Sequence, residues 1–538
     1  MSTTNTPISL RDALLLCGEL PEVAEHFAHV TLPFTPMPHQ IEGYQMARNE
    51  ARSGLFFAPR TGKTLVMQML AIFQAHYGVR TVQIMPPGLI RQFMHDYEDI
   101  KGHNLGIHAL TEGPAKRAKL LKLWLESPDS RPDVVLMSKE IFKPTWHHLY
   151  QAGFGCVHFD ESHLGLQNYD SHIAKEIRAF ANAQNTRLIL STGTPIPNQV
   201  RNCYTTMDLI NRGAYRSQTA FDAQHCIFKT ILIPSNGTIS ARAVMNGNYG
   251  GSGIGRGFKQ IKVVDSYVNL DMLSKNLYEH AVYASKLEVL DLESPNIQIV
   301  EVDLNKKHRA LYNRLLRERM LEIETEVIDA RTAQKLRMTA LQLISVPEDY
   351  SADLGPEHNS LYQTLDDLLG TIGPEQERVV IFANFTRTVE ALAKRYARYK
   401  PAIVYGPNGA DRNAREVERF HTDPDCRLLL ANPQSGGTGF KLGDCSQTVI
   451  FFEPVSSPGA FDQCISRVML KGQTQPVTSY ILSVRGTISP IAITHMLGKA
   501  SDVDAIMKTK KSLFEALLGR ADYDEDEDEE DEPELEAA

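Results

Sequence analysis

The sequence predicts an α/β protein built on two parallel sheets, and three observations carry this prediction. The chain has 538 residues, enough for roughly three to four domain-sized units. Short apolar runs alternate with amphipathic, helix-like stretches, and each run ends in Gly, Pro, Ser, Thr or an acid, as buried parallel strands do. The alternation occurs in two separate parts of the chain, which favours two α/β lobes with a different region between them.

The apolar runs form two groups. The first group is TVQIMPP (81–87), DVVLMS (133–138), CVHFDE (156–161) and RLILSTG (187–193). The second group is RVVIFAN (378–384), AIVYGP (402–407), RLLLANP (427–433), TVIFFEP (448–454) and TSYILSV (478–484). Between them lie a Gly-rich loop (246–257), whose glycines do not fit the G-x-G-x-x-G pattern of dinucleotide sites, and a helical stretch from about 305 to 370.

These patterns divide the chain into six parts. We expect an N-terminal segment (1–30), a first lobe (31–215), an insertion or linker with the Gly-rich loop (216–300), a helical region (301–370), a second lobe (371–520) and an acidic tail (521–538).

Composition indicates an ordinary globular protein of the cytoplasm. Hydrophobic residues make up 42% and charged residues 22% of the chain, which is the usual balance for soluble domains. An apolar run of about 18 residues, the length that would span a membrane, is absent from the sequence. The N-terminus has no basic segment before its short apolar run, so we expect no signal peptide. The seven cysteines form no C-x-x-C pair, so we expect reduced thiols and no bound metal of the zinc type.

The net charge is carried by the end of the chain. The stretch from Asp522 to Glu536 holds twelve acids and no base, and without them the net charge of −9 becomes +3. We therefore expect a mildly basic body and a disordered acidic tail. The tail either keeps the protein in solution or competes with nucleic acid for a basic groove.

The stretch FFAPRTGKTL (56–65) is similar to a phosphate-binding loop with one residue changed. The usual loop reads G-x-x-x-x-G-K-S/T, and Phe57 stands at its first glycine. The loop joins a predicted strand (53–57) to a predicted helix (64–74). At such a turn the backbone N–H groups of the helix start face the phosphates of a nucleotide.

The remaining loop residues suit the same chemistry. Gly62 stands where the backbone must approach the anion, and Arg60 and Thr61 keep the turn polar. We expect this loop to face solvent. We expect Lys63 to reach the β and γ phosphate oxygens of a nucleotide and Thr64 to ligate Mg²⁺. The alternative is a chance Gly-Lys-Thr in an ordinary loop.

A second candidate group is the acid pair at the end of the run CVHFDE. Asp160 and Glu161 follow the predicted strand about 100 residues after Lys63. Phosphoryl transfer to water needs one carboxylate to hold Mg²⁺ and another to orient the water. Adjacent acids at a strand tip supply both, and the alternative is an acidic pair that merely starts a helix.

These motifs resemble those of superfamily-two helicases, in the same order. The order along the chain is Lys63–Thr64, the D-E-x-H box (160–163) and then LSTGTPIPN (190–198). The third motif is close to the LTGTPIxN of the Swi/Snf-like branch of DNA translocases. Further segments that resemble the branch are PMPHQIEGYQMA (36–47), VQIMPPGLIRQF (82–93), VVIFANFTRTVEAL (379–392), LLLANPQSGGTGFKLGDCSQTVIFFEP (428–454), FDQCISRVMLKGQTQPVTSYIL (461–482) and VRGTISPIAI (484–493). The resemblance covers about residues 30–500.

The resemblance implies two tandem RecA-like P-loop lobes that bind ATP and Mg²⁺ between them. The residues that it assigns to ATP are Gln40, Arg60, Thr61, Gly62, Lys63, Thr64, Gly437 and Arg467, with Gln40 on the adenine. It assigns Mg²⁺ to Thr64 and Asp160, catalysis to Glu161, Gln463 and Arg467, and coupling between the sites to His163, Thr192, Gly193 and Thr194. The family pattern has a second Arg three residues after Arg467, where this sequence has Leu470 followed by Lys471. Lys cannot repeat a planar bidentate contact, so Arg467 alone suffices, Lys471 substitutes, or turnover is slow.

The resemblance also implies a DNA-binding surface at the strand tips. The matching positions are Pro87, Gly88, Ser138, Lys139, Asn384, Ser435 and Gly436. Small residues there let backbone N–H groups approach phosphates, and phosphate contacts carry no base information. The alternative is that these residues only make tight turns.

We therefore expect an ATP-dependent DNA translocase or helicase that moves on DNA, preferably duplex, without reading its sequence. From the length outside the matching segments we expect no chromodomain, bromodomain, nuclease or zinc module. This compactness resembles stand-alone members encoded by phages or bacteria, acting in the bacterial cytosol or an infected host cell. The alternatives are a DNA-binding module with a weak or dead ATPase, suggested by Phe57 and Leu470, and an enzyme that separates strands.

Overall fold

The computed structural model describes most of the chain as two compact units. The described residues are 6–234, 258–314, 330–351, 354–375, 377–436, 442–455, 457–470, 473 and 475–507. Of these, the first unit holds the residues up to His225, Asn269–Asp291 and 505–507, and the second unit holds Cys226–Val268 and the rest from Leu292 onward. The predicted acidic tail and the Gly-rich loop lie outside the described residues.

The first unit contains a seven-stranded sheet in the order β11-β3-β8-β7-β4-β6-β5, and every neighbouring pair is parallel. Its strands are β3 (Arg52–Phe57), β4 (Arg80–Ile84), β5 (Ile107–Ala109), β6 (Val134–Met137), β7 (Phe154–Phe159), β8 (Arg187–Ser191) and β11 (Ala281–Ala284). Its helices are α1 (Leu10–Leu16), α2 (Pro21–Glu25), α3 (Pro38–Asn49), α4 (Lys63–His76), α5 (Ile90–Asp99), α6 (Pro114–Glu126), α7 (Lys139–Gln151), α8 (His163–Leu166), α9 (His172–Ala181), α10 (Tyr204–Ile210), α11 (Gln218–His225), α13 (Leu270–Tyr278) and α14 (Lys286–Val289). A short antiparallel pair, β1 (Ile8–Ser9) and β2 (Thr31–Leu32), lies outside the large sheet.

Burial on both faces explains why these strands read as continuous apolar runs. All four residues of β6 are buried, and α4 is buried along nearly its whole length. Parallel strands covered by helices on both sides need apolar side chains at every position. The runs predicted as strands are strands here.

β11 is a strand that the periodicity did not reveal. Ala281–Ala284 pairs in parallel with β3, residue for residue from Gly54 to Phe57. Gly54 makes the close approach possible, because a Cβ there would lie 2.8 Å from the Cβ of Ala281. Part of the segment that we assigned to an insertion (216–300) thus extends the first sheet next to the strand that carries the phosphate loop.

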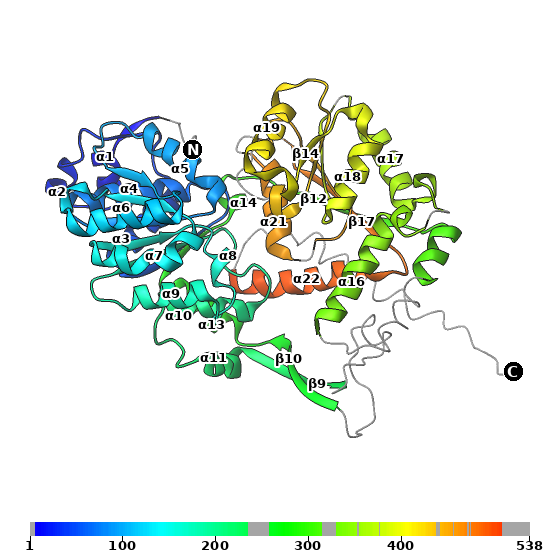
Figure 1. The fold of residues 1–538 in the computed structure, drawn as a ribbon, viewed down its shortest axis with the longest axis horizontal. Coiled ribbons are helices and arrows are strands. Elements are labelled where there is room, and N and C mark those ends of the chain that lie inside the picture. The colour runs from blue at the N-terminus through cyan, green and yellow to red at the C-terminus, as the bar shows by residue number, and fades with distance from the viewer. Residues whose placement is uncertain are drawn as a thin grey trace. The chain divides into compact units, whose positions relative to one another are not determined.

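The second unit contains a six-stranded, all-parallel sheet in the order β12-β17-β16-β13-β15-β14. Its strands are β12 (Asn296–Val302), β13 (Val379–Phe382), β14 (Ala402–Val404), β15 (Leu428–Ala431), β16 (Thr448–Phe451) and β17 (Thr478–Val484). Its helices are α16 (Ala330–Ser345), α17 (Ser360–Ile372), α18 (Thr386–Arg395), α19 (Gly409–Thr422), α20 (Pro433–Gly436), α21 (Pro458–Val468) and α22 (Ile488–Met507). The antiparallel hairpin of β9 (Cys226–Pro234) and β10 (Phe258–Tyr267), green in Figure 1, joins this unit by its contacts.

Two parallel α/β sheets confirm the predicted fold class. Along the chain, the described residues between β8 and β12 form the β9–β10 hairpin in addition to β11 and helices. Among the described helices, none is both long enough and apolar enough to cross a membrane.

Candidate nucleotide-binding site

The predicted phosphate loop is the turn between β3 and α4. The strand ends at Phe57, and Gly62 caps the helix with a left-handed φ of 88°. Glycine is required there, because a Cβ would lie 1.9 Å from Nε2 of Gln40. Arg60 is also left-handed, with φ of 69°, so the loop turns sharply before the helix starts at Lys63.

Two side chains of α3 hold the loop by its backbone. Gln40 donates from Nε2 to the carbonyl of Thr61 (3.0 Å), and its Oε1 accepts from the N–H of Met37 (2.8 Å). Nε2 of His39 lies 2.7 Å from the same Thr61 carbonyl. Burial lowers the pKa of His39 and the carbonyl contact raises it in part, so a neutral ring that donates from Nε2 is the consistent state. His39 was not among the predicted residues, although it directly precedes Gln40.

The structure explains Phe57 in place of the first glycine. Its ring is fully buried, lies edge-on to His39 at 4.9 Å and leaves no room for a side chain at Gly43, where a Cβ would come within 2.6 Å. The carbonyl of Phe57 accepts a hydrogen bond from Nζ of Lys63 (2.9 Å). Phe57 therefore contributes a backbone group to the loop and a side chain to the core. Lys63 is only 8% exposed, so the expectation of a solvent-facing lysine is wrong, because its ammonium folds back onto the strand.

Asp160 lies at the end of β7, inside the sheet's carboxyl edge. Its N–H donates to the carbonyl of Ile84 (2.7 Å), and its Oδ1 accepts from Oγ of Ser191 (3.0 Å). Burial, and then the neighbouring Glu161, raise the pKa of the Asp160 carboxyl above its ordinary value, against the opposite influence of Lys63. A raised pKa at a buried acid beside a lysine is typical of functional sites. Ser191 was not predicted as a site residue.

Glu161 and His163 connect the acid pair to the segment after β8. Glu161 has a left-handed φ of 47°, an uncommon conformation for this residue type. Its carboxylate lies 3.3 Å from Nδ1 of His163, and the same nitrogen lies 2.8 Å from Oγ1 of Thr192. Oγ1 of Thr192 also accepts from the N–H of Thr194 (3.0 Å). A chain of contacts therefore runs from Glu161 to Thr194: Glu161 lies at ion-pair distance from His163, and hydrogen bonds continue from His163 to Thr192 and Thr194.

Gly193 brings this chain against the phosphate loop. A Cβ at Gly193 would lie 2.7 Å from Cδ of Pro59 and 3.3 Å from the carbonyl of Phe57. The residues predicted for the first lobe at Gln40, 60–64, 160–163 and 192–194 thus meet at one edge of one sheet.

The donor set suits Mg²⁺ and a phosphate chain. Oγ1 of Thr64 makes no hydrogen bond within the described residues. The charge of Lys63 acts on the carboxyl of Asp160 and opposes the rise of its pKa. Mg²⁺ takes oxygen ligands, usually one or two from protein side chains together with phosphates and waters. Thr64 and Asp160 are the residues that fit this ion.

The strand tips of the first unit show two kinds of surface. Pro87 and Gly88 lie exposed in a 3₁₀ turn after β4. Ser138 is the buried N-cap residue of α7, and Nζ of Lys139 donates to the carbonyl of Leu164 (2.8 Å).

Asn384 forms hydrogen bonds that connect two strand ends in the second unit. Its side-chain amide donates to the carbonyl of Pro454 (2.9 Å), and its N–H donates to the carboxylate of Glu453. Glu453 is buried and also accepts from Oγ1 of Thr388 (2.7 Å). Burial raises the pKa of Glu453, and these hydrogen bonds oppose the rise. The strand tips of β13 and β16 are therefore tied together through Glu453.

Of the other predicted residues of the second unit, Ser435 and Gly436 lie in the four-residue helix α20. Gly437 and Lys471 lie outside the described residues. Gln463 and Arg467 both lie on α21, where Arg467 is only 7% exposed.

The end of α21 contacts a turn that precedes β16. The carbonyl of Arg467 accepts from the N–H of Leu442 (3.0 Å). Beyond the helix, the N–H of Leu470 donates to Oε1 of Gln473 (2.9 Å). A Cβ at Gly443 would lie 2.6 Å from Cγ of Leu470, so Leu470 packs where this glycine leaves room.

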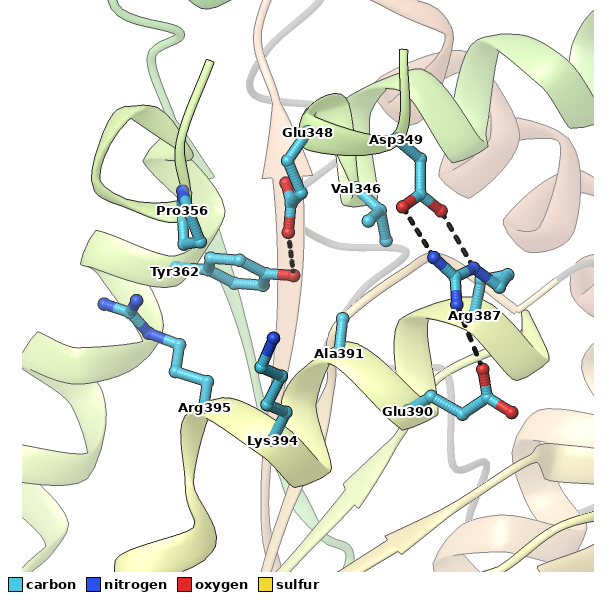
Figure 2. A pocket seen from close by; sticks show the side chains of 10 residues that line it. All are labelled: Val346, Glu348, Asp349, Pro356, Tyr362, Arg387, Glu390, Ala391, Lys394 and Arg395. Atoms are coloured by element: carbon cyan, nitrogen blue, oxygen red, sulfur yellow. Dashed lines mark hydrogen bonds and ion pairs between the residues drawn. The ribbon is translucent and has the colours of Figure 1, made fainter. Parts of the chain in front are cut away.

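A cavity of about 560 Å³ lies beside α18 in the second unit (Figure 2). Arg387 donates to both carboxylate oxygens of Asp349 (2.9 and 2.7 Å), and Tyr362 donates to Glu348 (2.9 Å). The guanidinium of Arg395 lies over the Tyr362 ring, 5.0 Å from its centre. These contacts tie α18 and α17 to the 3₁₀ turn Pro347–Asp349, and nothing in the sequence pattern indicated this cavity.

Comparison with protein families finds two matches that divide the chain. Residues 41–351 match the SNF2-related domain, and residues 360–472 match the helicase conserved C-terminal domain.

Individual relatives are distant. A DNA repair and recombination protein RAD54-like of Drosophila grimshawi is 24% identical over 462 residues, covering 81% of this chain and 56% of the relative. The DNA repair and recombination protein RAD54 of Saccharomyces cerevisiae is 22% identical over 417 residues, covering 71% and 43%. The chain thus spans about half the length of the curated relatives that it matches. Among solved structures, the Sulfolobus solfataricus SWI2/SNF2 ATPase core in complex with dsDNA aligns with a TM-score of 0.36 at 16% identity, covering 90% of this chain and 96% of that one.

Proposed function

The chain belongs to the SNF2-related family, and from this premise we propose that it is a DNA-dependent ATPase that couples ATP hydrolysis to movement along DNA without reading the base sequence. The observation that supports this most is the chain of contacts in the first unit. It runs from the phosphate loop through Gly193 to Thr192, His163 and Glu161. Such a chain can transmit a change at the phosphates to the segment after β8, and a translocase requires coupling of this kind.

In this proposal the loop and the acid pair have different roles toward Mg-ATP. The N–H groups at the start of α4 and the ammonium of Lys63 bind phosphate oxygens, which the positive end of a helix favours. Thr64 and Asp160 hold the metal. Bound Mg-ATP supplies the phosphoryl group that water attacks. Glu161 orients that water and accepts its proton, and Gln40 together with Arg60 and Thr61 shapes the nucleotide side of the loop.

The second unit contributes a positive charge in this proposal. Arg467 stabilises the charge that develops on the transferred phosphoryl group, with Gln463 and Gly437 at the same nucleotide. The support is the sequence pattern around α21 together with the low exposure of Arg467, since a guanidinium in a poorly hydrated position acts strongly on a nearby phosphate.

The DNA surface remains the one that the sequence indicates, at Pro87, Gly88, Ser138, Lys139, Asn384, Ser435 and Gly436. Pro87 and Gly88 are exposed in the first unit, which suits contact with a phosphate backbone. The side chains of Lys139 and Asn384 are bonded within the protein, so we propose that these two positions act by shaping their loops. Duplex DNA is the proposed partner, and the cytoplasm of a bacterium or of a phage-infected cell is the proposed place of action.

A DNA-binding module without effective turnover is the alternative. Leu470 is the residue that favours it, because the second arginine of the family pattern is replaced there. Phe57 gives it little support, since its side chain lies in the core and its carbonyl serves the loop.

ATPase rates measured in parallel with duplex DNA, single-stranded DNA and RNA test the proposal. We expect stimulation by duplex DNA of more than one sequence and no turnover in Lys63→Ala. DNA binding with a DNA-independent, Lys63-insensitive background rate would reject the proposal in favour of the binding module. A strand-displacement assay with the same protein then separates unwinding from movement along the duplex.

A further inference from the structure

A second cavity of the second unit lies at the edge of the sheet opposite to the strand tips. Its volume is about 530 Å³, and it is bordered by Arg378, Arg427 and Gln447, which precede β13, β15 and β16. The turn that includes Asp444 and Cys445 forms another part of its wall. Its size is that of a site for a small molecule.

Cys445 differs from the other cysteines of the chain. All seven lie in the described residues and none of them forms a disulfide; six are buried, while Cys445 is partly exposed. Its Sγ lies 2.9 Å from Nδ1 of His421, at the end of α19. A thiol paired with an imidazole in an accessible cavity has a proton acceptor at hand, which is the arrangement that activates sulfur nucleophiles.

The cavity also carries charges of both signs around this thiol. The guanidinium of Arg378 is bonded to neutral carbonyls, those of Cys426 (3.2 Å) and Asp423 (2.9 Å), and so keeps its full charge. The side chains of Arg427 and Asp444 form no hydrogen bond or ion pair within the described part of the chain. A ligand with a carboxylate and an ammonium group finds a partner for each.

We propose that Cys445 is a modification site that undergoes thiol–disulfide exchange with a small disulfide of the amino-acid type, one that carries both carboxylate and ammonium groups. The thiol proton passes to Nδ1 of His421, and the thiolate attacks one sulfur of the disulfide. A bond forms between Sγ and that sulfur while the original S–S bond breaks, and the other half leaves as a thiolate that takes up a proton. Cys445 is oxidised to a mixed disulfide and the departing half is reduced to a thiol.

The surroundings make this reaction selective. Burial raises the pKa of the Cys445 thiol, and the charge of Arg378 counteracts the rise while Asp444 adds to it. The thiolate is therefore scarce without help, so binding of the disulfide beside Arg427 and transfer of the proton to His421 decide which disulfides react.

The modified turn touches the helix that carries Arg467. Within the turn, the N–H groups of Cys445 and Ser446 both donate to the carbonyl of Leu442 (3.1 Å each), whose own N–H donates to the carbonyl of Arg467. A Cβ at Gly443 would lie 2.3 Å from the carbonyl of Val468, so the turn and the helix end are in close contact. A group attached at Cys445 displaces this turn and with it the backbone of Arg467. This second step rests on the proposed function of Arg467.

The chemical step is tested on the full-length protein with two probes, oxidised glutathione and the uncharged 2-hydroxyethyl disulfide. We expect oxidised glutathione to modify Cys445 alone, located by peptide mass mapping. After correction for the intrinsic rates on a free thiol, it should react about two- to fivefold faster than the uncharged probe, the ratio that a partly exposed charge pair provides. Arg427→Ala should remove this preference, and His421→Gln should slow both probes.

Arg415→Ala is the matched control, because Arg415 is an exposed arginine of α19 that does not border the cavity. It should leave both rates unchanged. Equal corrected rates for the two probes, modification at another cysteine, or equal effects of Arg427→Ala and Arg415→Ala would overturn the proposal.

The regulatory step is tested by ATPase rate with duplex DNA before and after glutathionylation. We expect the modified protein to lose most of its activity and to regain it with dithiothreitol, while Cys445→Ser keeps its activity under both conditions. Full activity at complete modification would overturn the link to Arg467. A protein that is modified at Cys445 but shows no ATPase with any polymer would contradict the proposed function and leave the modification site standing, because mass mapping does not depend on turnover.

Discussion

The phosphate loop of the first unit and the end of α21 in the second unit carry the candidate catalytic residues in different ways. In the first unit four separate chain segments meet. Side chains bond segments to each other, Gln40 to Thr61, Ser191 to Asp160 and His163 to Thr192, and Lys63 bonds Phe57 within the phosphate loop. In the second unit Arg467 lies on one helix, whose last turn is held through the backbone by Leu442.

This difference predicts different responses to substitution. Residues in one hydrogen-bonded network are coupled, so a substitution at one position alters the free-energy contribution of the others. A residue positioned by its own helix can be replaced with less effect on its neighbours. We therefore expect the effects of substitutions on ATPase activity to be coupled among the site residues of the first unit and to be independent in the second unit.

The largest effect is expected for Lys63→Ala. It removes the charge on the phosphates, so ATP turnover should fall to the background rate with any DNA. Because Lys63 is buried and bonded to Phe57, circular dichroism and thermal unfolding must show that the fold survives. A folded Lys63→Ala protein with near wild-type turnover would remove the phosphate loop from the mechanism.

Glu161→Gln should separate binding from hydrolysis. The amide keeps the size of the side chain and removes the carboxylate that orients water, while Asp160 still holds the metal. We expect ATP binding close to that of the wild type, measured by a fluorescent ATP analogue, and no hydrolysis. Loss of nucleotide binding instead would show that the roles of the two acids are exchanged.

In the second unit, Arg467→Ala should cost far more than Lys471→Ala. Removal of an arginine that acts on a transferred phosphoryl group lowers the rate by roughly 10³–10⁵. Steady-state ATPase rates of the two variants decide between the positions. A greater loss in Lys471→Ala would place the critical charge four residues along the chain, next to Leu470.

Acid should weaken both units through a buried histidine in each. Burial lowers the pKa of His158 in β7 to about 3 and that of His308 in the second unit to about 4. Both values lie below the ordinary 6.5, so each neutral ring contributes stability above pH 6.5 that is lost as pH falls toward its folded pKa. The loss is about 1.4 kcal/mol for each pH unit and each histidine.

Denaturant unfolding at pH 7 and pH 5 measures this loss. His158→Leu should flatten the pH dependence of the transition that belongs to the first unit, and exposed His148→Leu, on α7, should not. An unchanged pH dependence in His158→Leu would mean that another group governs acid unfolding of that unit.

The smallest effect concerns the coupling within the first unit. His163→Ala and Thr192→Val each break the same hydrogen bond (2.8 Å), so the double variant should lose less than the sum of the two single losses. Contacting residues show interaction energies of about 0.5–3 kcal/mol. Strict additivity in ATPase rate would mean that this bond does not connect the acid pair to the segment after β8.

Much of the site was predictable because its motifs are local. The loop before α4, the acids after β7 and the segment after β8 each lie within about ten consecutive residues, and parallel strands bring their ends to one edge. Their side-chain partners were not predictable. Ser191 bonds Asp160 from 31 positions away, and no spacing rule connects a strand-end serine to an acid on the neighbouring strand.

The sequence by itself determined the two parallel sheets, the turn at Gly62 and the acid pair at the tip of β7, because strand periodicity, a left-handed glycine and a motif order are properties of short segments. Only the tertiary structure decided that β11 lies beside β3, that the ring of Phe57 enters the core while its carbonyl serves Lys63, and that Cys445 faces His421. Each of these depends on contacts between residues that are distant in the chain or on the direction of a side chain, and such contacts are set by packing of the whole unit.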